Sequence, residues 1–188
     1  MDGLLHRAMR RIAGFPSARG GVAAVEFALI ATPFFMLLFG IVELGLLFMS
    51  TTNLEAATID ASRAIRTGSF QQSGTPTLAN FKATVCADEA WLSSSDCNAN
   101  VVVDVRTFAD FSAISVSPPV TNNALDPSKT QFSPGTPCSV VLVRVFYPYT
   151  LMAPLLEPGM PNLGPGKRLL TSTVAFRNED YAGLTPCS

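Results

Sequence analysis

Two carboxylates, Glu26 and Glu43, are the only charged groups in the 28-residue apolar stretch Val22–Met49. A carboxylate in a lipid-spanning helix costs a few kcal/mol unless it is protonated, solvated or paired. No Lys or Arg lies between Arg19 and Arg63. The residues leave three partners open for Glu26: an α-amine made by cutting the chain, a group on another subunit, or water at the headgroup level.

Glu43 follows Glu26 by 17 residues, which corresponds to about 26 Å along an α-helix and to a different helix face. Glu43 is therefore expected near the outer end of a membrane span. Solvation at that interface and contact with another protein chain are both open to it.

Catalysis by imidazole is hard to reconcile with this composition. The single histidine, His6, lies in the basic N-terminal stretch, so a domain beyond the membrane would have none for acid-base chemistry or metal binding. A Ser–Lys pair using Lys82, Lys129 or Lys167 stays open. The net charge of −1 without a Lys/Arg cluster argues against nucleic-acid binding. We expect no enzyme activity, no cofactor and no metal.

The four cysteines, Cys86, Cys97, Cys138 and Cys187, all follow the apolar stretch. An even number in an oxidising compartment permits two disulfides, in any of three pairings. Pairing Cys86 with Cys97 would close a short loop between a helix and a strand, and pairing Cys138 with Cys187 would tie a strand to the C-terminus. We favour that pairing; a zinc site is disfavoured because no CxxC spacing occurs.

The apolar stretch divides the chain into two sides. About 20 apolar residues span a bilayer, so Val22–Met49 is long enough to cross once, and it is too long for an ordinary secretory signal. Residues 1–21 carry four arginines, and no basic residue follows until Arg63. This bias keeps the N-terminus in the cytoplasm and exports the chain from about residue 50.

Helical spacing continues beyond the apolar stretch, which predicts one helix from Val22 to Thr67, kinked at Pro33. Its outer part either lies on its own domain or meets a partner helix in an assembly. The small apolar stripe that carries this prediction consists of Leu54, Ala57, Ala61, Ala64 and Gly68.

The remaining chain predicts a small α+β domain with one helix and an antiparallel sheet of about three strands. The expected elements are a linker at 69–78, a helix at 78–91 and strands at 99–108, 139–149 and 168–178. The expected parts are a basic cytoplasmic leader at 1–21, a transmembrane helix at 22–49, its extracytoplasmic extension at 50–68 and a disulfide-bonded domain at 69–188.

The segment Arg19-Gly20-Gly21, followed by Val22-Ala-Ala-Val and Glu26-Phe27, resembles the processing site of type IV prepilin-like proteins. GVAAVEFALIATPFFMLLFGIVELG further resembles the signature of the TadE-like family, the minor pilins or pseudopilins of the tight adherence (Flp) pilus. LEAATIDASRAIRTG, VCADEAWLSSSDCNANVVVDVRTF, FSPGTPCSVVLVRVFYPY and KRLLTSTVAFRNEDY resemble segments found in the same order in that family. Phe27 stands where major Flp pilins carry tyrosine.

This resemblance implies a pilin-like fold and a non-enzymatic role in pilus initiation or assembly. It implies that a prepilin peptidase cuts between Gly21 and Val22, and that Glu26 meets the new amine of a neighbouring subunit. Glu26, Phe27 and Glu43 are the expected association residues. The implied partners are other pilins or pseudopilins, the assembly machinery, the peptidase and the lipid bilayer. The implied location is the bacterial inner membrane, with a periplasmic C-terminal domain and entry into the fibre left open.

Two other classes stay open. A membrane-anchored periplasmic enzyme would need a pocket with a perturbed lysine or paired carboxylates. A permanently anchored binding module would keep its leader and remain a monomer.

Overall fold

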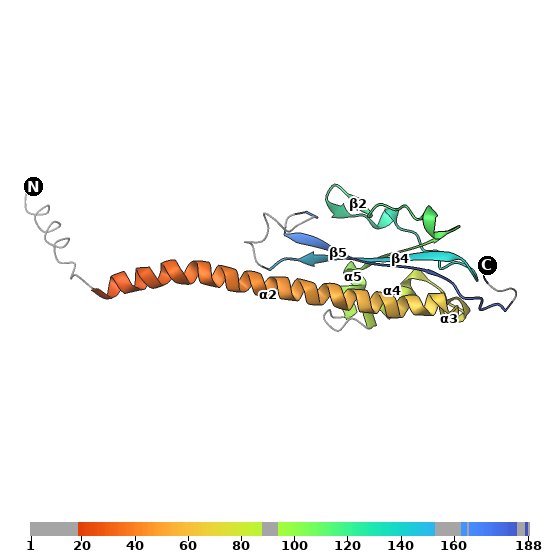
Figure 1. Cartoon of the computed structure of the whole chain (residues 1–188), viewed down its shortest axis with the longest axis horizontal. Coiled ribbons are helices and arrows are strands. Elements are labelled where there is room, and N and C mark those ends of the chain that lie inside the picture. The colour runs from red at the N-terminus through yellow and green to blue at the C-terminus, as the bar shows by residue number, and fades with distance from the viewer. Residues whose placement is uncertain (1–18, 88–93, 153–162, 165, 184–186, 188) are drawn as a thin grey trace, which may run out of the picture. The chain divides into compact units, whose positions relative to one another are not determined.

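The computed structural model describes residues 19–87, 94–152, 163–164, 166–183 and 187. It divides into two units that meet within one helix, α2 (Arg19–Arg66): the first ends at Ile41 and the second begins at Val42 (Figure 1). Most of the expected leader, residues 1–18, lies outside the described residues. The expected extension 50–68 falls in the same unit as the sheet.

In the first unit, α2 is an exposed apolar helix. It begins at Arg19 and includes Gly20 and Gly21, three residues earlier than the predicted start at Val22. The helix also continues past Pro33, which has no N–H to donate to the Leu29 carbonyl. Within the described residues, no side chain from Val22 to Ile41 is buried.

The second unit is α+β, as the sequence predicts. After α2 come α3 (Ser69–Gln72), α4 (Leu78–Ala87) and α5 (Ser94–Asn100). The sheet consists of β1 (Val102–Phe108), β4 (Val140–Thr150) and β5 (Lys167–Arg177), and a small hairpin pairs β2 (Val120–Thr121) with β3 (Ala124–Leu125). Two short 3₁₀ turns lie at Phe111–Ala113 and Pro127–Lys129.

The three long strands form an antiparallel sheet in the order β1-β4-β5. Val105 pairs with Val143, and Val143 pairs with Val174. The strand predictions are confirmed to within a few residues. The expected linker contains the single-turn helix α3 instead, and the expected helix at 78–91 is described only as far as Ala87, because residues 88–93 lie outside the described part.

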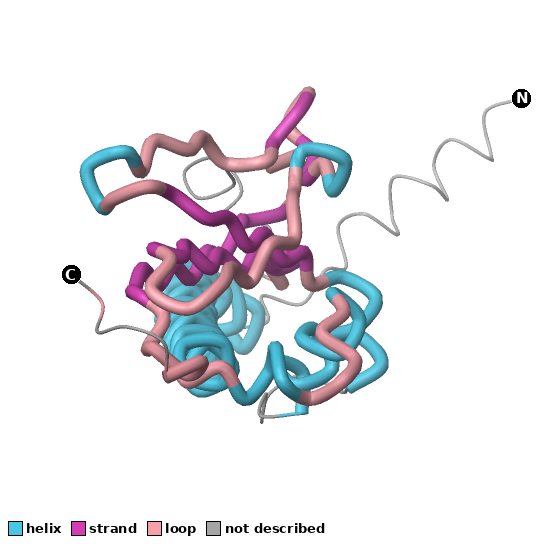
Figure 2. Tube along the Cα trace, turned by 90° about the vertical axis from the view of Figure 1, so that its right-hand side faces the viewer, coloured by secondary structure: helices cyan, strands magenta, loops and turns pink. Residues whose placement is uncertain are grey.

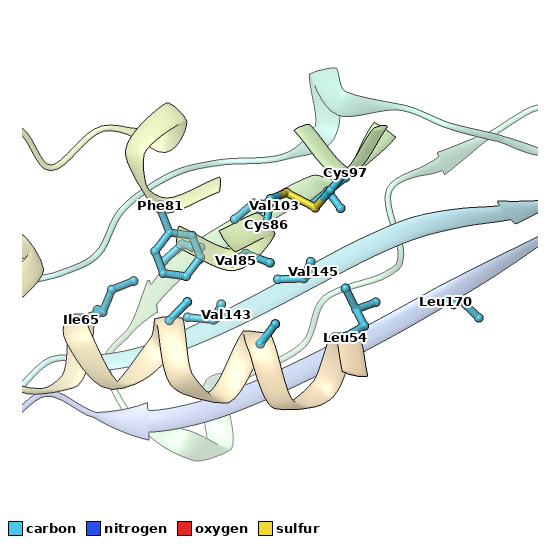
Figure 3. Packing of buried hydrophobic residues seen from close by; sticks show 14 of the residues in the cluster. Leu54, Ile65, Phe81, Val85, Cys86, Cys97, Val103, Val143, Val145 and Leu170 are labelled. Carbon is cyan, nitrogen blue, oxygen red and sulfur yellow. A yellow bond between two sulfur atoms is a disulfide. The ribbon is translucent and has the colours of Figure 1, made fainter. Parts of the chain in front are cut away.

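The core lies between the helices and one face of this sheet. Figure 2 shows the helices of the second unit on that face and loop segments over the other. Alternate strand residues point toward the helices because side chains alternate along a strand. The contacting residues are buried and come from both layers (Figure 3): Leu54, Ala57, Ala61 and Ile65 from α2, Phe81 and Val85 from α4, and Val103, Val105, Val141, Val143 and Val145 from the sheet.

The outer stripe of α2 therefore lies on its own domain, the first of the two alternatives. Gly68 ends the helix in the left-handed conformation, with φ of 77°, which glycine adopts without steric cost. A Cβ there would collide with the ring of Tyr181. Gly68 thus ends the helix and also allows the C-terminal segment to pass close to it.

The opposite face of the sheet is organised by a buried ion pair that sequence reasoning missed. Arg144 Nη2 lies 2.6 Å from Asp104 Oδ2 across the β1–β4 pair, and Asp104 is fully buried. Asp104 Oδ1 also accepts the Gln131 N–H at 2.7 Å, and Arg144 Nη1 donates to the Ser117 carbonyl at 3.0 Å. These bonds fasten the long connection between β1 and β4 to the sheet.

Two disulfides are present, Cys86–Cys97 and Cys138–Cys187, in the pairing that the sequence analysis favours. The first joins α4 to α5, and the second joins the start of β4 to the C-terminal segment. They close sequence separations of 11 and 49 residues, for which chain-entropy arguments give about 3 and about 4 kcal/mol.

We predict that removing the longer bridge destabilises the domain more. Cys138→Ser with Cys187→Ser should lower the free energy of unfolding by about 4 kcal/mol, against about 3 kcal/mol for Cys86→Ser with Cys97→Ser, because the longer loop restrains the unfolded chain more. Urea unfolding of the full chain in detergent measures both. Thiol labelling of the denatured, unreduced wild type should modify no cysteine; four labelled cysteines per chain would contradict both bridges.

We also predict that Asp104→Asn is strongly destabilising, by about 3–5 kcal/mol, because it leaves the Arg144 guanidinium buried without its counter-charge. Asp60→Asn, an exposed change on α2, is the matched control and should stay within about 0.5 kcal/mol. Equal unfolding midpoints for the two variants would show that the ion pair does not hold the connection in place.

Candidate functional site

The expected processing site lies on the exposed helix of the first unit. Gly21 and Val22 are both exposed and helical. A Cβ added to Gly21 would meet no atom within 4 Å. The fold itself therefore does not require glycine at this position, and any requirement must come from a molecule that acts on the chain.

Glu26 is exposed and lies seven residues after the start of α2. No described residue forms a hydrogen bond or ion pair with it. Its neighbours are apolar, and the adjacent Phe27 is 71% exposed. Glu26 thus presents an uncompensated carboxylate on an apolar helix surface, a placement that is costly in lipid and calls for a partner outside the described chain.

Glu43 has a different environment, in the second unit. Its residue is only 3% exposed, so the carboxylate is not solvated at an interface. Glu43 Oε2 accepts the backbone N–H of Met152, just beyond β4, at 3.2 Å. Its other oxygen, Oε1, and the Tyr149 hydroxyl are both buried, and neither makes a hydrogen bond of standard geometry within the described part of the chain.

Tyr149 responds electrostatically to this neighbour. The pKa of Tyr149 is raised to about 12, mainly by burial and in smaller part by the charge of Glu43. A phenolate beside a carboxylate would place two negative charges in a poorly solvated site. The neutral phenol is therefore held against Glu43, and this contact links the helix to the end of β4.

Sequence reasoning missed Tyr149 and Met152 as neighbours of Glu43, although part of the signal was there. Glu43, Leu47 and Leu54 share one helix face by spacing, and all three are buried. Tyr149 shares the helix-facing side of β4 with Val145 by alternation. The sequence pattern does not contain the axial register of β4 against α2, and it is this register that brings Tyr149 and Met152 to the level of Glu43.

Two spaces among the described residues bear on the enzyme alternative, which requires a pocket with a perturbed lysine or paired carboxylates. A groove of about 400 Å³ between α2 and β5 is lined by Asp60 with Arg63 and Arg66, without a second carboxylate or a lysine. A cavity of about 380 Å³ beside the β2–β3 hairpin contains Lys167 among apolar and amide groups. Burial lowers the pKa of Lys82, but Lys82 lines neither space. Neither space therefore contains the expected catalytic combination.

We predict that Glu43→Gln lowers the pKa of Tyr149 from about 12 toward its ordinary value, without restoring it fully, because the burial contribution remains. Since the raised pKa favours the neutral phenol in the fold, the associated stability is complete below pH of about 10 and is lost as pH rises through about 12. Phenolate absorbance, with Tyr149→Phe as the reference, measures the titration. An unchanged Tyr149 titration in Glu43→Gln would show that the charge of Glu43 does not influence the pKa of Tyr149.

Part of this chain is similar to a known protein family. Residues 21–63 match the family model described as TadE-like protein. Searches of curated proteins and of solved structures give no significant match. The matched stretch contains Gly21, Val22, Glu26, Phe27 and Glu43, and it lies wholly within α2. The resemblance of this chain to the TadE-like family is thereby confirmed over residues 21–63.

Proposed function

We propose that this protein is a non-enzymatic minor pilin or pseudopilin that supports initiation or assembly of a Flp-type, tight adherence pilus. The TadE-like match indicates involvement in that system. The observation that carries the finer proposal is the first part of α2. It is an apolar helix whose most hydrophobic window is entirely unburied, and it bears one carboxylate, Glu26, that has no partner among the described residues.

The exposed apolar surface of α2 needs a nonaqueous environment. Among the described residues, α2 is the one helix that is long and apolar enough to cross a membrane. Before pilus assembly, lipid would cover this surface; after assembly, the helices of neighbouring pilins would cover it. The side chains that would exchange these environments are exposed: Val22, Val25, Phe27, Leu29, Ile30, Phe34, Leu37 and Phe39.

Glu26 gives such packing a specific register. Cutting after Gly21 would create an α-amine at Val22, four residues before Glu26. The amine of the same helix lies among unpaired backbone N–H groups that already favour an anion. The amine of a neighbouring chain is the more discriminating partner, because only one axial offset between helices brings it to Glu26.

The proposed topology has the N-terminus in the cytoplasm and the sheet domain in the periplasm. The leader's four arginines support this orientation. The two disulfides support it independently, because such bonds persist in oxidising compartments. Phe27 and Glu43 remain proposed association residues, although Glu43 already has contacts within its own chain.

We predict cleavage after Gly21. The membrane-purified protein should begin at Val22 in cells with a functional prepilin peptidase, and Gly21→Val should keep its leader. Since a Cβ at Gly21 meets nothing in the fold, an uncut variant would report recognition by the peptidase and not misfolding. N-terminal sequencing decides this, and an intact Met1 in the wild type would contradict the proposal.

We predict that Glu26→Gln weakens association without harming the sheet domain. The change keeps side-chain size and removes the charge, so membrane insertion and both disulfides should be unchanged. Crosslinking to other pilins and pilus output should fall several-fold at equal protein levels. Glu55→Gln, an exposed change in the second unit, is the matched control. Normal piliation with Glu26→Gln would show that this carboxylate is merely tolerated.

A further inference from the structure

We propose that the end of the sheet formed by the last residues of β4 and the first of β5 docks onto the headgroup layer of a bilayer containing anionic phospholipid. The docking patch consists of Met152 and Lys167, which lie at this end of the sheet, together with the exposed residues of the helix segment Val42–Met49, which Met152 contacts through Glu43. All of these residues belong to the second unit. The inference rests on the proposed single-pass placement and adds a lipid contact made by the folded domain itself.

The first observation is the surface of α2 at this level. Val42, Leu44, Phe48 and Met49 are exposed. Glu43, the only charged residue in this segment, turns its carboxylate into the protein. The segment thus presents an apolar surface to its surroundings.

The second observation fixes where the sheet end lies along this helix. The Met152 N–H donates to Glu43 Oε2 at 3.2 Å, so the end of β4 lies at the level of Glu43. Glu43 precedes the last apolar residue, Met49, by six positions, or about 9 Å of helix. The sheet end therefore lies beside the apolar part of α2 and not beside its polar continuation.

The length of the apolar stretch places this level in the headgroup layer. A hydrocarbon core of about 30 Å takes about 20 helical residues. The stretch Val22–Met49 has 28 residues, about eight more than the hydrocarbon core requires. If the core begins at Val22, these surplus residues are Val42–Met49. Their exposed side chains then lie in the interfacial region of the bilayer, which accommodates both apolar and polar groups.

The chemistry of the sheet end fits the same region. Met152 is 66% exposed although it is apolar. Lys167 is exposed, and its backbone pairs with Thr150 at the same end of the sheet. Met152 and Lys167 thus place an apolar and a basic side chain at the same end of the sheet, and that combination binds membrane interfaces, with the cation attracted to anionic headgroups.

The test uses tryptophan fluorescence of the full-length chain in vesicles of phosphatidylcholine and phosphatidylglycerol with brominated acyl chains. Trp91, the single tryptophan, is replaced by Phe. One reporter is then introduced at a time: Met152→Trp at the patch, Leu37→Trp in the span, and Phe111→Trp as the control. Phe111 is exposed and follows β1, whose last residue pairs with the opposite end of β4.

Met152→Trp should lose part of its fluorescence to brominated lipid, less than Leu37→Trp because the headgroup layer lies above the brominated acyl chains, while Phe111→Trp should lose none and remain accessible to aqueous iodide. Omitting phosphatidylglycerol should reduce the loss at Met152→Trp, and Lys167→Glu should abolish that dependence. A non-reducing gel verifies both disulfides in every variant.

Three results would overturn the inference. If Met152→Trp behaves like Phe111→Trp, the patch faces water. If it is shielded from both bromine and iodide, another protein chain covers it. In both of these cases quenching of Leu37→Trp would leave the proposed membrane placement intact. If Leu37→Trp is also unquenched, that placement fails together with the docking.

Discussion

Packing of one face of α2 against the sheet is the constraint on which the second unit depends. Leu54 and Ile65 each remove a large side chain from water, worth about 1.5–3 kcal/mol when burial is complete. Ala57 and Ala61 between them are small, which lets the helix approach the valines of β1 and β4 closely. The small residues set the helix–sheet distance, and the large ones stabilise the contact.

The opposite face of the sheet is held by a different kind of interaction. The connection from β1 to β4 is long and rich in polar residues and proline, so it cannot bury enough apolar surface to order itself. Asp104 and Arg144 compensate by accepting and donating bonds to backbone groups of this connection. Asp104 also forms an ion pair with the less buried Arg106. Because Asp104 and Arg144 are buried, loss of either one leaves the other as a buried charge without its main partner.

The two carboxylates of α2 illustrate how position along one helix decides function. Glu26 lies where no described part of the chain reaches it, so its charge is available to an external partner. Glu43 lies where β4 ends, and the backbone of Met152 and the phenol of Tyr149 occupy its surroundings. Residues of the same type in the same apolar stretch therefore have unlike surroundings: Glu26 is exposed, and Glu43 joins the helix to the sheet.

Much of this architecture is determined locally and could be predicted. The apolar stretch, the 3-4 spacing from Leu54 onward, the alternation in the strands and the left-handed preference of Gly68 each depend on nearby residues only. The favoured cysteine pairing also followed from the order of helix and strands. The α5 helix and the β2–β3 hairpin were missed because their sequences are short and polar and carry no periodic signal.

Contacts between distant segments were decided only by the tertiary structure. Asp104 and Arg144 are 40 residues apart, and nothing in their own sequence neighbourhoods distinguishes them from solvent-exposed charges. Glu43 and Met152 are separated by 109 residues, and their meeting depends on the axial register of α2 against β4. That register is the sum of many packing contacts across the helix–sheet interface, so no single motif contains it. The sequence alone determined that Glu26 and Glu43 need partners; only the packed fold supplied one to Glu43, and among the residues that the structure describes it left Glu26 without one.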